Sequence, residues 1–291
     1  MSKILLVDVD SKIPNLALMK LSAYHKSIGD EVGFNVNDPD KVYASIVFKK
    51  HAINPIMLQL QYPDAEIEIG GCGQDLHKTL PEEVEYIKPD YDLYPDMDYS
   101  MGFTTRGCIR NCYFCIVPKK EGMIQVNQHP KEFWDEKHEK LLLLDNNVMA
   151  SPKWFKEVVD WINEHNLKAV FNQGLDARLL TKELAEYTAS IVPFDNHTVV
   201  FAFDDTKLEP TIRKSVKLLS EAGLNPRGKL MYYVYCHDHD MVDDALYRCN
   251  VLKELGTNPF VMCNIDKPRT KRMKDLRRWA NKKQLFWSCS F

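Results

Sequence analysis

The stretch MGFTTRGCIRNCYFC, residues 101–115, carries the strongest indication of both fold and chemistry in this chain. Its first part, MGFTTRG, is predicted to form a strand that leads into a loop with Cys108, Cys112 and Cys115. The spacing CxxxCxxC gathers three soft thiolate ligands on one short loop, where they can hold a single inorganic centre. Four-iron clusters are bound by cysteine thiolates, normally four of them. Three thiolates leave one iron open to a substrate or a cofactor, which favours an enzyme.

Zinc is the main alternative occupant of this loop, because thiolates are also among its preferred ligands. Structural zinc sites, however, have four closed ligands, usually arranged as two separated pairs, and no histidine near the loop supplies an obvious fourth. The other cysteines are scattered singly along the chain: Cys72, Cys236, Cys249, Cys263 and Cys289. The sequence therefore favours an iron–sulfur cluster and leaves zinc open.

The start of the chain argues against disulfides. MSKILLVDVD, residues 1–10, carries charge from its third residue and is typical of a strand rather than of a hydrophobic leader. We therefore expect a cytoplasmic protein, in which clustered cysteines stay reduced and serve in metal binding or catalysis. The longest apolar runs are about half as long as a bilayer-spanning helix requires, so no membrane span is expected.

Charge is distributed unevenly along the 291 residues. Residues 1–100 contain 9 Lys, no Arg and 17 acidic residues, a net charge of −8, whereas the rest of the chain carries +5. The change coincides with KPDYDLYPDMDYS, residues 88–100, whose prolines disfavour helix and which we interpret as an ordered surface linker. The sequence thus predicts two domains, residues 1–98 and residues 99–291. A loop inside a single domain remains the alternative.

Strands and helices alternate before the linker. Strands are predicted over residues 3–10, 42–48 and 65–71, and a helix with apolar positions at roughly helical spacing over residues 14–28. Such alternation is typical of a parallel sheet with helical crossovers. The first domain is therefore predicted to be a small parallel α/β domain.

The alternation continues on a larger scale after the linker. Six strands are predicted over residues 101–107, 140–147, 167–173, 197–205, 229–236 and 259–265. Crossovers between parallel strands are right-handed and strands consecutive in sequence usually neighbour each other, so these units predict a barrel-like sheet. Because a complete TIM barrel has eight units, we expect an open, partial (βα)6 TIM-like barrel.

Residues 99–265 resemble the radical S-adenosylmethionine (radical SAM) superfamily. Its hallmark is CxxxCxxC on the loop after the first strand of a six-unit partial barrel, and FTTRGCIRNCYFCIVPKKEG, residues 103–122, is similar to that loop. The resemblance implies a [4Fe–4S] cluster on the three cysteines, with S-adenosylmethionine on the open iron and the aromatic Phe114 beside it. It also implies an external electron donor such as flavodoxin or ferredoxin, and cleavage of S-adenosylmethionine to a 5′-deoxyadenosyl radical that abstracts hydrogen from a substrate. The sequence does not identify this substrate.

Polar residues at the carboxyl ends of the predicted strands are further candidates, because functional groups of barrels gather there. In the family, a Gly-Gly-Glu-like turn binds the amine of S-adenosylmethionine; this chain has LLDNN instead, so the resemblance assigns that role to Asp145 or Asn146. Arg178 would pair with the carboxylate, and Gln173 and Asp176 would contact ribose hydroxyls. Each also suits a helix cap or a turn. The remaining strand-end residues are Asn147, Asp204, Asp205, Cys236, Cys263 and Asn264.

The first domain weakly resembles the cobalamin-binding Rossmann-like domain that precedes many radical SAM barrels. It is shorter than that domain and lacks the DxHxxG motif, so we expect a repurposed domain rather than a working cobalamin site. A cobalamin-dependent radical SAM methyltransferase is the alternative. The tRNA methylthiotransferases are similar to this chain over the stretch CYFCIVPKKEG. They carry a second cluster on three N-terminal cysteines, however, where this chain has only Cys72. Methylthiolation is therefore disfavoured.

The C-terminal segment KPRTKRMKDLRRWANKK, residues 267–283, holds nine basic residues and one acidic residue. Met273, Leu276 and Trp279 share one face of a helix. The simpler interpretation is a helix that closes the barrel with its basic face in solvent. Nucleic-acid binding by this segment, and with it an RNA-modifying enzyme, is the alternative.

For the protein as a whole, a non-catalytic iron–sulfur or zinc module with a binding or regulatory role also remains open.

Overall fold

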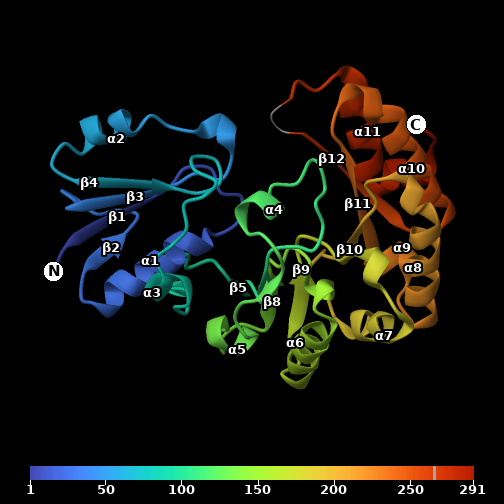
Figure 1. Ribbon diagram of the computed structural model, residues 1–291, viewed down its shortest axis with the longest axis horizontal. Coiled ribbons are helices and arrows are strands. Elements are labelled where there is room, and N and C mark those ends of the chain that lie inside the picture. The colour runs from blue at the N-terminus through green and yellow to red at the C-terminus, as the bar shows by residue number, and fades with distance from the viewer. Residues whose placement is uncertain (265–266) are drawn as a thin grey trace. The chain divides into compact units, whose positions relative to one another are not determined.

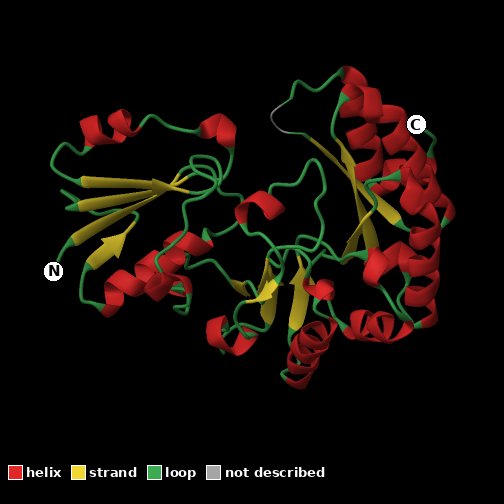
Figure 2. Ribbon diagram, in the orientation of Figure 1, coloured by secondary structure: helices red, strands yellow, loops and turns green. Residues whose placement is uncertain are grey.

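The computed structural model of the chain describes residues 1–264 and 267–291. It is a mixed α/β structure whose main sheets are parallel (Figure 2), which confirms the predicted α/β class. Contacts divide the chain into two units: residues 1–102 with 128–138, and residues 103–127 with 139–291. None of the helices in the described part of the chain is long and apolar enough to cross a membrane.

The first unit extends past the predicted boundary at residue 98 and takes in a second segment, which contains α5 (Pro130–Phe133). A buried tyrosine joins the two segments. The hydroxyl of Tyr91 accepts a hydrogen bond from the amide of Met101 at 3.2 Å and donates one to the carbonyl of Phe133 at 2.5 Å. The segment expected to be a surface linker is therefore anchored by a side chain that is only 7% exposed.

Four parallel strands form the sheet of the first unit, in the order β2-β1-β3-β4. They are β1 (Lys3–Asp8), β2 (Glu31–Gly33), β3 (Lys41–Ser45) and β4 (Glu66–Gly70). In the register, Val42 lies between Leu5 of β1 and Ile67 of β4. The sequence predicts β1, β3 and β4. It does not predict β2, because three residues are too few to show a period.

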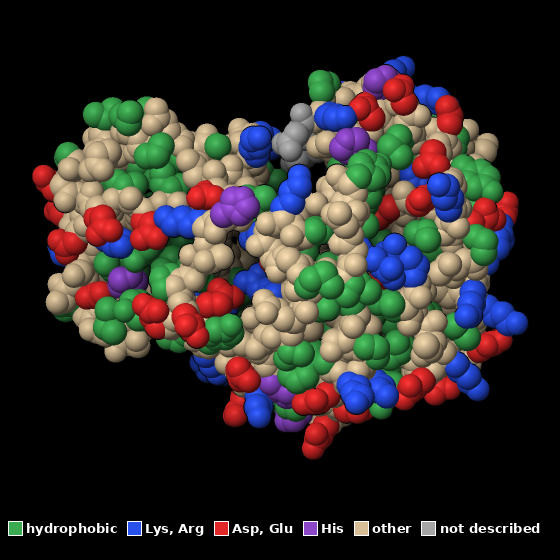
Figure 3. Space-filling model, in the orientation of Figure 1, with side chains coloured by type: hydrophobic (Ala, Val, Ile, Leu, Met, Phe, Trp, Pro, Cys, Tyr) green, Lys and Arg blue, Asp and Glu red, His purple; other side chains and the backbone are tan. Residues whose placement is uncertain are grey.

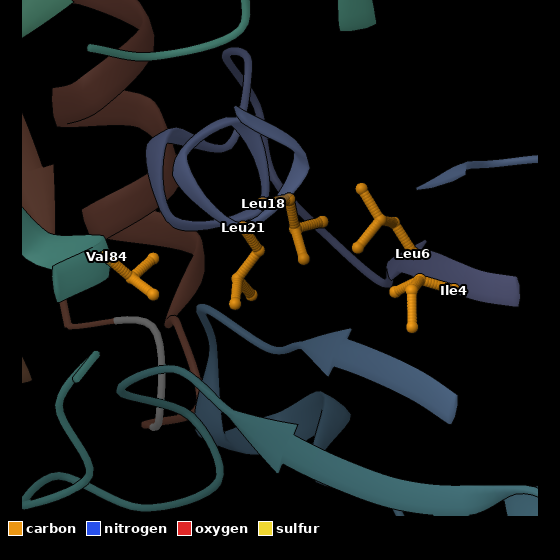
Figure 4. Close-up of a cluster of buried hydrophobic side chains, with 5 residues drawn as sticks. All are labelled: Ile4, Leu6, Leu18, Leu21 and Val84. Atoms are coloured by element: carbon orange, nitrogen blue, oxygen red, sulfur yellow. The ribbon is translucent and has the colours of Figure 1, made fainter. Parts of the chain in front are cut away.

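One face of this sheet is covered by α1 (Leu16–Ser27) and α3 (Glu82–Glu85). The helix α1 begins where the side chain of Asn15 accepts a hydrogen bond from the amide of Leu18. Apolar side chains from β1, α1 and α3 then form a buried cluster (Figure 4): Ile4, Leu6, Leu18, Leu21 and Val84. The remaining elements of the unit are η1 (Lys49–His51), α2 (Pro55–Gln61), η2 (Tyr91–Leu93) and β5 (Ser100–Gly102).

The second unit contains parallel strands that alternate with helices (Figure 1). The strands are β8 (Lys140–Leu143), β9 (Lys168–Phe171), β10 (Val199–Ala202), β11 (Leu230–Cys236) and β12 (Asn258–Cys263). β8 pairs with β9, and β10, β11 and β12 pair in that order. A parallel bridge from Leu175 to Phe201 connects the end of β9 to β10. Ile265 of the last predicted strand lies outside the described residues.

The strand predicted over residues 101–107 is divided. Its start lies in β5, and its end forms β6 (Thr105–Arg106), which pairs antiparallel with β7 (Gln125–Val126). The break has a tertiary cause: the carboxylate of Asp145 accepts the backbone N–H groups of Thr104 and Thr105 at 3.2 and 2.5 Å. Thr104 lies outside both strands, because its amide is bound by a side chain and is not available to a strand partner.

Helices follow the strands of the second unit and bury one apolar face each. In α6, for example, Phe155, Val158, Val159 and Ile162 are fully buried. The helices are α4 (Val117–Lys120), α6 (Pro152–Glu164), α7 (Lys182–Ser190), α8 (Glu209–Glu221), α9 (Pro226–Lys229), α10 (Val242–Glu254), α11 (Lys271–Asn281) and α12 (Lys283–Ser288). Short 3₁₀ turns stand at η3 (Val148–Ala150), η4 (Ala177–Leu179), η5 (Thr206–Leu208) and η6 (His239–Met241).

The residues of β11 alternate between the two faces of the sheet, as the period of a strand requires. On the helix-covered face, the hydroxyls of Tyr232 and Ser215 of α8 are 2.7 Å apart. On the other face, the ring of Tyr235 lies 4.6 Å from the ring of Phe114 in the cysteine loop. The even-numbered residues of β11, including Cys236, therefore lie on the helix side, and the odd-numbered residues lie on the side of the cysteine loop.

The basic segment forms the helix that the sequence predicts. Thr270 caps its start by accepting the amide of Met273 at 3.3 Å, and Met273, Leu276 and Trp279 are buried. One of its arginines, Arg272, pairs with Asp243 of α10. On the face drawn in Figure 3, basic and acidic side chains are interspersed over the C-terminal helices.

Candidate metal centre

Two glycines and a glutamate close the base of the cysteine loop. Gly107 has a φ of +78°, and a Cβ there would lie 2.3 Å from the carbonyl oxygen of Met123. The amide of Cys108 donates to the carbonyl of Gly122 at 3.1 Å. The carboxylate of Glu121 accepts the amide of Gly107 and the guanidinium of Arg106, each at 3.0 Å. The ends of the loop are thus held together by the backbone and by one carboxylate.

Cys108, Cys112 and Cys115 are all partly buried within this loop. The amide of Cys115 donates to the carbonyl of Cys112 at 3.0 Å, which forms a turn between the last two cysteines. The sulfur of Cys108 accepts hydrogen bonds from the amide of Arg110 at 3.3 Å and from Nδ2 of Asn147 at 3.4 Å. These two contacts fix the position of the Cys108 sulfur.

Burial raises the pKa of Cys112 and of Cys115 above the usual value of a thiol. The positive charge of Arg178 opposes this rise at Cys112, and the amide of Val117 opposes it at Cys115. A bound metal centre would remove these protons, because its positive charge favours thiolate ligands.

Thiolates are ligands that suit an iron–sulfur cluster as well as zinc, and the side chain of Asn147 lies beside one of them. In the described part of the chain, no three His, Cys, Asp or Glu side chains converge on one point as ligands of a single metal ion do. Oδ1 of Asn147 is buried and has no hydrogen-bond partner among the described residues. An unpartnered buried oxygen beside Cys108 is compatible with a further group at this place.

A network of charged hydrogen bonds beyond the end of β9 connects the cysteine loop to the segment that follows this strand. The carboxylate of Asp176 accepts Nε of Arg110 at 2.9 Å and Nε of Arg178 at 2.6 Å. Burial acts to raise the pKa of Asp176, but the hydrogen bonds and charges of the two arginines outweigh it and lower that pKa. Asp176 also caps η4 by accepting the amide of Arg178. Part of the Arg178 guanidinium is therefore already bound to Asp176, and its positive charge acts on Cys112.

Two candidates at the end of β8 have different surroundings. Asp145 is 1% exposed, and its carboxylate accepts the amides and the hydroxyls of Thr104 and Thr105. This placement favours a structural role for Asp145. Asn146 is half-buried and donates to Glu121 at 2.5 Å, so it lies at the base of the cysteine loop.

The other candidates divide between the two faces of the sheet. Gln173 is exposed beyond β9. Asp204, at the end of β10, accepts the amide of Tyr235 at 2.8 Å; burial raises its pKa, and the neighbouring arginines partly offset the rise. Phe114 packs against Tyr235 with their rings tilted by 37°. Cys236 and Cys263 lie on the helix side and do not belong to this site.

Arg110 and Glu121 are not among the residues predicted from the sequence, although both hold the loop. Their positions next to the CxxxCxxC motif are a signal, but their partners lie elsewhere. Asp176 is 66 residues from Arg110, and Gly107 is 14 residues from Glu121. Only the folded chain brings these groups together.

No protein-family model matches the chain, and no curated protein matches it in sequence.

Proposed function

We propose that this chain is a radical SAM enzyme that binds a [4Fe–4S] cluster through Cys108, Cys112 and Cys115. The observation that carries the proposal is the CxxxCxxC loop itself. It is closed at its base by Gly107 and Glu121, and it contacts the ends of β9 and β11 through Arg110 and Phe114. Ligand sites of parallel α/β structures lie at the carboxyl ends of strands.

A [4Fe–4S] cluster held by Cys108, Cys112 and Cys115 would, once reduced, supply the electron for cleavage of S-adenosylmethionine to methionine and a 5′-deoxyadenosyl radical. The protein's own residues position the reactants and exclude water. Arg178 would bind the carboxylate of S-adenosylmethionine through the part of its guanidinium that Asp176 leaves open. Asn146 would accept its amine, and Gln173 and Asp176 remain the candidates for the ribose hydroxyls. Phe114 and Tyr235 supply apolar ring surfaces on which adenine would pack.

The consecutive parallel strands β8 to β12, each followed by a helix, support the partial barrel that we propose for the second unit. The first unit has the strand order of a small parallel α/β domain but no histidine in a DxHxxG motif. We therefore propose a reaction without cobalamin. An external electron donor would be required, and the substrate is open, because loops rather than the cluster motif select it.

Reconstitution tests the proposal directly. Protein reconstituted with iron and sulfide without oxygen, then reduced by dithionite, is expected to release 5′-deoxyadenosine from S-adenosylmethionine, measured by chromatography. Cys115→Ala should lose both the iron–sulfur absorption and the product. Cys289→Ala is the matched control, because Cys289 is exposed and remote from the loop in sequence; it should retain both.

Two results would contradict the proposal. One is stoichiometric zinc in place of iron, which would favour a structural zinc module. The other is a stable iron–sulfur cluster that leaves S-adenosylmethionine intact, which would favour a non-catalytic binding or regulatory module. Circular dichroism of each variant separates loss of the cluster from loss of the fold.

A further inference from the structure

Cys236 and Cys263 lie directly beside each other at the ends of two neighbouring strands. They are the last residues of β11 and β12, and they are partners in the parallel register. Paired residues on adjacent parallel strands direct their side chains to the same face, with the strands about 4.8 Å apart. Disulfides join Cα atoms that are roughly 4.4 to 6.8 Å apart. The pairing therefore brings the two thiols within bonding range without a change of register.

The two thiols differ in their surroundings. Cys236 is fully buried, whereas Cys263 is partly exposed at the edge strand β12. The helices α10 and α11 cover one face of β11 and β12 (Figure 1). By strand register both cysteines lie on that face, opposite to the cysteine loop. The pair thus consists of one thiol within reach of solvent and a second, protected thiol behind it, and it is separate from the candidate metal centre.

The charges around the pair favour a thiolate on the exposed member. A hydrogen bond with Cys236 lowers the pKa of Cys263 to about 7; burial opposes this, and Arg269 and Arg277 assist it. The same hydrogen bond, together with burial, raises the pKa of Cys236. The charged groups that act on Cys236 are Arg248 and Asp244 of α10. Next to the pair, Lys267 binds Asp238 at 2.5 Å and joins the segments that follow the two strands.

We propose that Cys263 and Cys236 form a thiol–disulfide exchange site, in which Cys263 is the attacking thiol and Cys236 is the resolving thiol. Its reaction partners are small or protein-borne disulfides. A partly exposed cysteine poised beside a second cysteine is the arrangement that reversible thiol oxidation uses.

The exchange needs no reactant besides the disulfide. The thiolate of Cys263 attacks one sulfur of the disulfide RSSR, and a bond forms between Cys263 and that sulfur as RS⁻ leaves. The thiol of Cys236 then gives up its proton and attacks the sulfur of Cys263, which releases the second RS⁻. The two protons of the original thiols end on the two leaving thiols. The protein dithiol is oxidised by two electrons, and RSSR is reduced to two RSH.

Peptide mapping of the full-length chain tests the site. Reduced protein is freed of reductant without oxygen, incubated with excess oxidised glutathione, alkylated and digested. The expected product is a peptide pair linked through Cys236 and Cys263. In Cys236→Ser, Cys263 should instead retain glutathione, because no resolving thiol is present. In Cys263→Ser the linked pair should disappear while Cys236 stays unmodified.

Alkylation kinetics of the unmodified chain provide a measurement that needs no variant. The rate at Cys263 should reach half of its plateau near pH 7 and be roughly tenfold below the plateau one pH unit lower. Cys249, which is buried in α10 and whose pKa burial raises to about 12, is the unreactive control. The exposed Cys289 is the reactive control without a partner thiol.

The proposal is overturned if Cys289 becomes glutathionylated and no Cys236–Cys263 link forms, or if Cys263 is alkylated no faster than Cys249 at pH 7. Repeating the mapping on a chain in which Cys108, Cys112 and Cys115 are Ala separates this site from the metal centre. The link should still form there, whatever the fate of the proposed radical SAM activity.

Discussion

Asp176 illustrates how one buried carboxylate can organise a site from several segments. Its side chain is 7% exposed and accepts hydrogen bonds from Arg110 in the cysteine loop and from Arg178 after β9. Two arginines that share one carboxylate are held in fixed positions, because a guanidinium binds a carboxylate directionally. At the residue scale, the position of the cysteine loop therefore depends on Asp176.

Asp176→Asn should destabilise the protein by about 2 kcal/mol at neutral pH, because it removes the charge that two partly buried arginines share. The lowered pKa of Asp176 means that this stabilisation is present above about pH 4 and is lost as pH falls through the folded-state pKa. Urea unfolding of the metal-free protein at pH 7 and at pH 3 measures the difference in unfolding free energy between Asp176→Asn and the unmodified chain. This difference should be smaller at pH 3.

The matched control is Asp240→Asn. Asp240 is 83% exposed and pairs only with an exposed histidine among the described residues, so its replacement should change stability by less than about 1 kcal/mol. Equal loss of unfolding free energy in both variants at pH 7 would contradict the pairing role of Asp176. A loss for Asp176→Asn that is the same at pH 3 as at pH 7 would contradict it as well.

At the scale of elements, the cysteine loop depends on two glycines with positive φ that meet different surroundings. Gly107 has its Cβ direction blocked by the carbonyl of Met123, whereas a Cβ on Gly122 would have no atom within 4 Å. Alanine at Gly122 therefore measures the free-energy cost of the backbone conformation alone, whereas alanine at Gly107 adds the cost of a steric clash.

Gly122→Ala should lower the free energy of unfolding by about 1 kcal/mol, which is the penalty of a left-handed conformation for a residue with a Cβ atom. Gly107→Ala should cost more, because the loop must also move away from Met123, and it should reduce the iron that the protein retains after reconstitution. Iron content and urea unfolding of both variants measure the difference. If both variants lose the same amount of iron and of unfolding free energy, the close approach of Gly107 to the carbonyl of Met123 is unimportant.

At the scale of the whole molecule, the first unit is completed by residues from beyond the cysteine loop. Residues 128–138 supply Phe133, which is fully buried, and a Cβ on Gly102 would lie 2.7 Å from its ring. The fragment 1–102 therefore lacks part of its own core. A cut at the boundary that composition suggests would leave Tyr91 without the carbonyl of Phe133.

The fragment 1–102 should be less stable than one in which a short Gly/Ser linker joins residues 1–102 to residues 128–138. The expected difference is about 3 kcal/mol, which is typical of losing a buried phenylalanine. Phe133→Ala in the linked fragment should remove most of the gain, as chemical denaturation would measure. A linked fragment no more stable than fragment 1–102 would contradict this division of the chain.

The sequence predicts β1, β3, β4 and the strands from β8 to β12, because period and turn signals are local. It misses β2 and β7, because three and two residues are too few to show a period. It also misses the division into β5 and β6, because Asp145 acts on Thr104 and Thr105 from 41 and 40 residues away. Polar residues at strand ends are recognisable in the sequence, but their partners are not. Asp145 and Asp176 follow similar strands, yet one is bound by threonines and the other by arginines.

The sequence by itself determines the spacing of the three cysteines and the alternating α/β pattern, because each depends on residues close together in the chain. Only the tertiary structure decides which strand-end groups meet. It assigns Asp145 to the interior, ties Arg110 to Asp176 and places Cys236 beside Cys263. The physical reason is strand register: the alternation of a strand sets the face of each side chain, and the pairing of strands sets its neighbour.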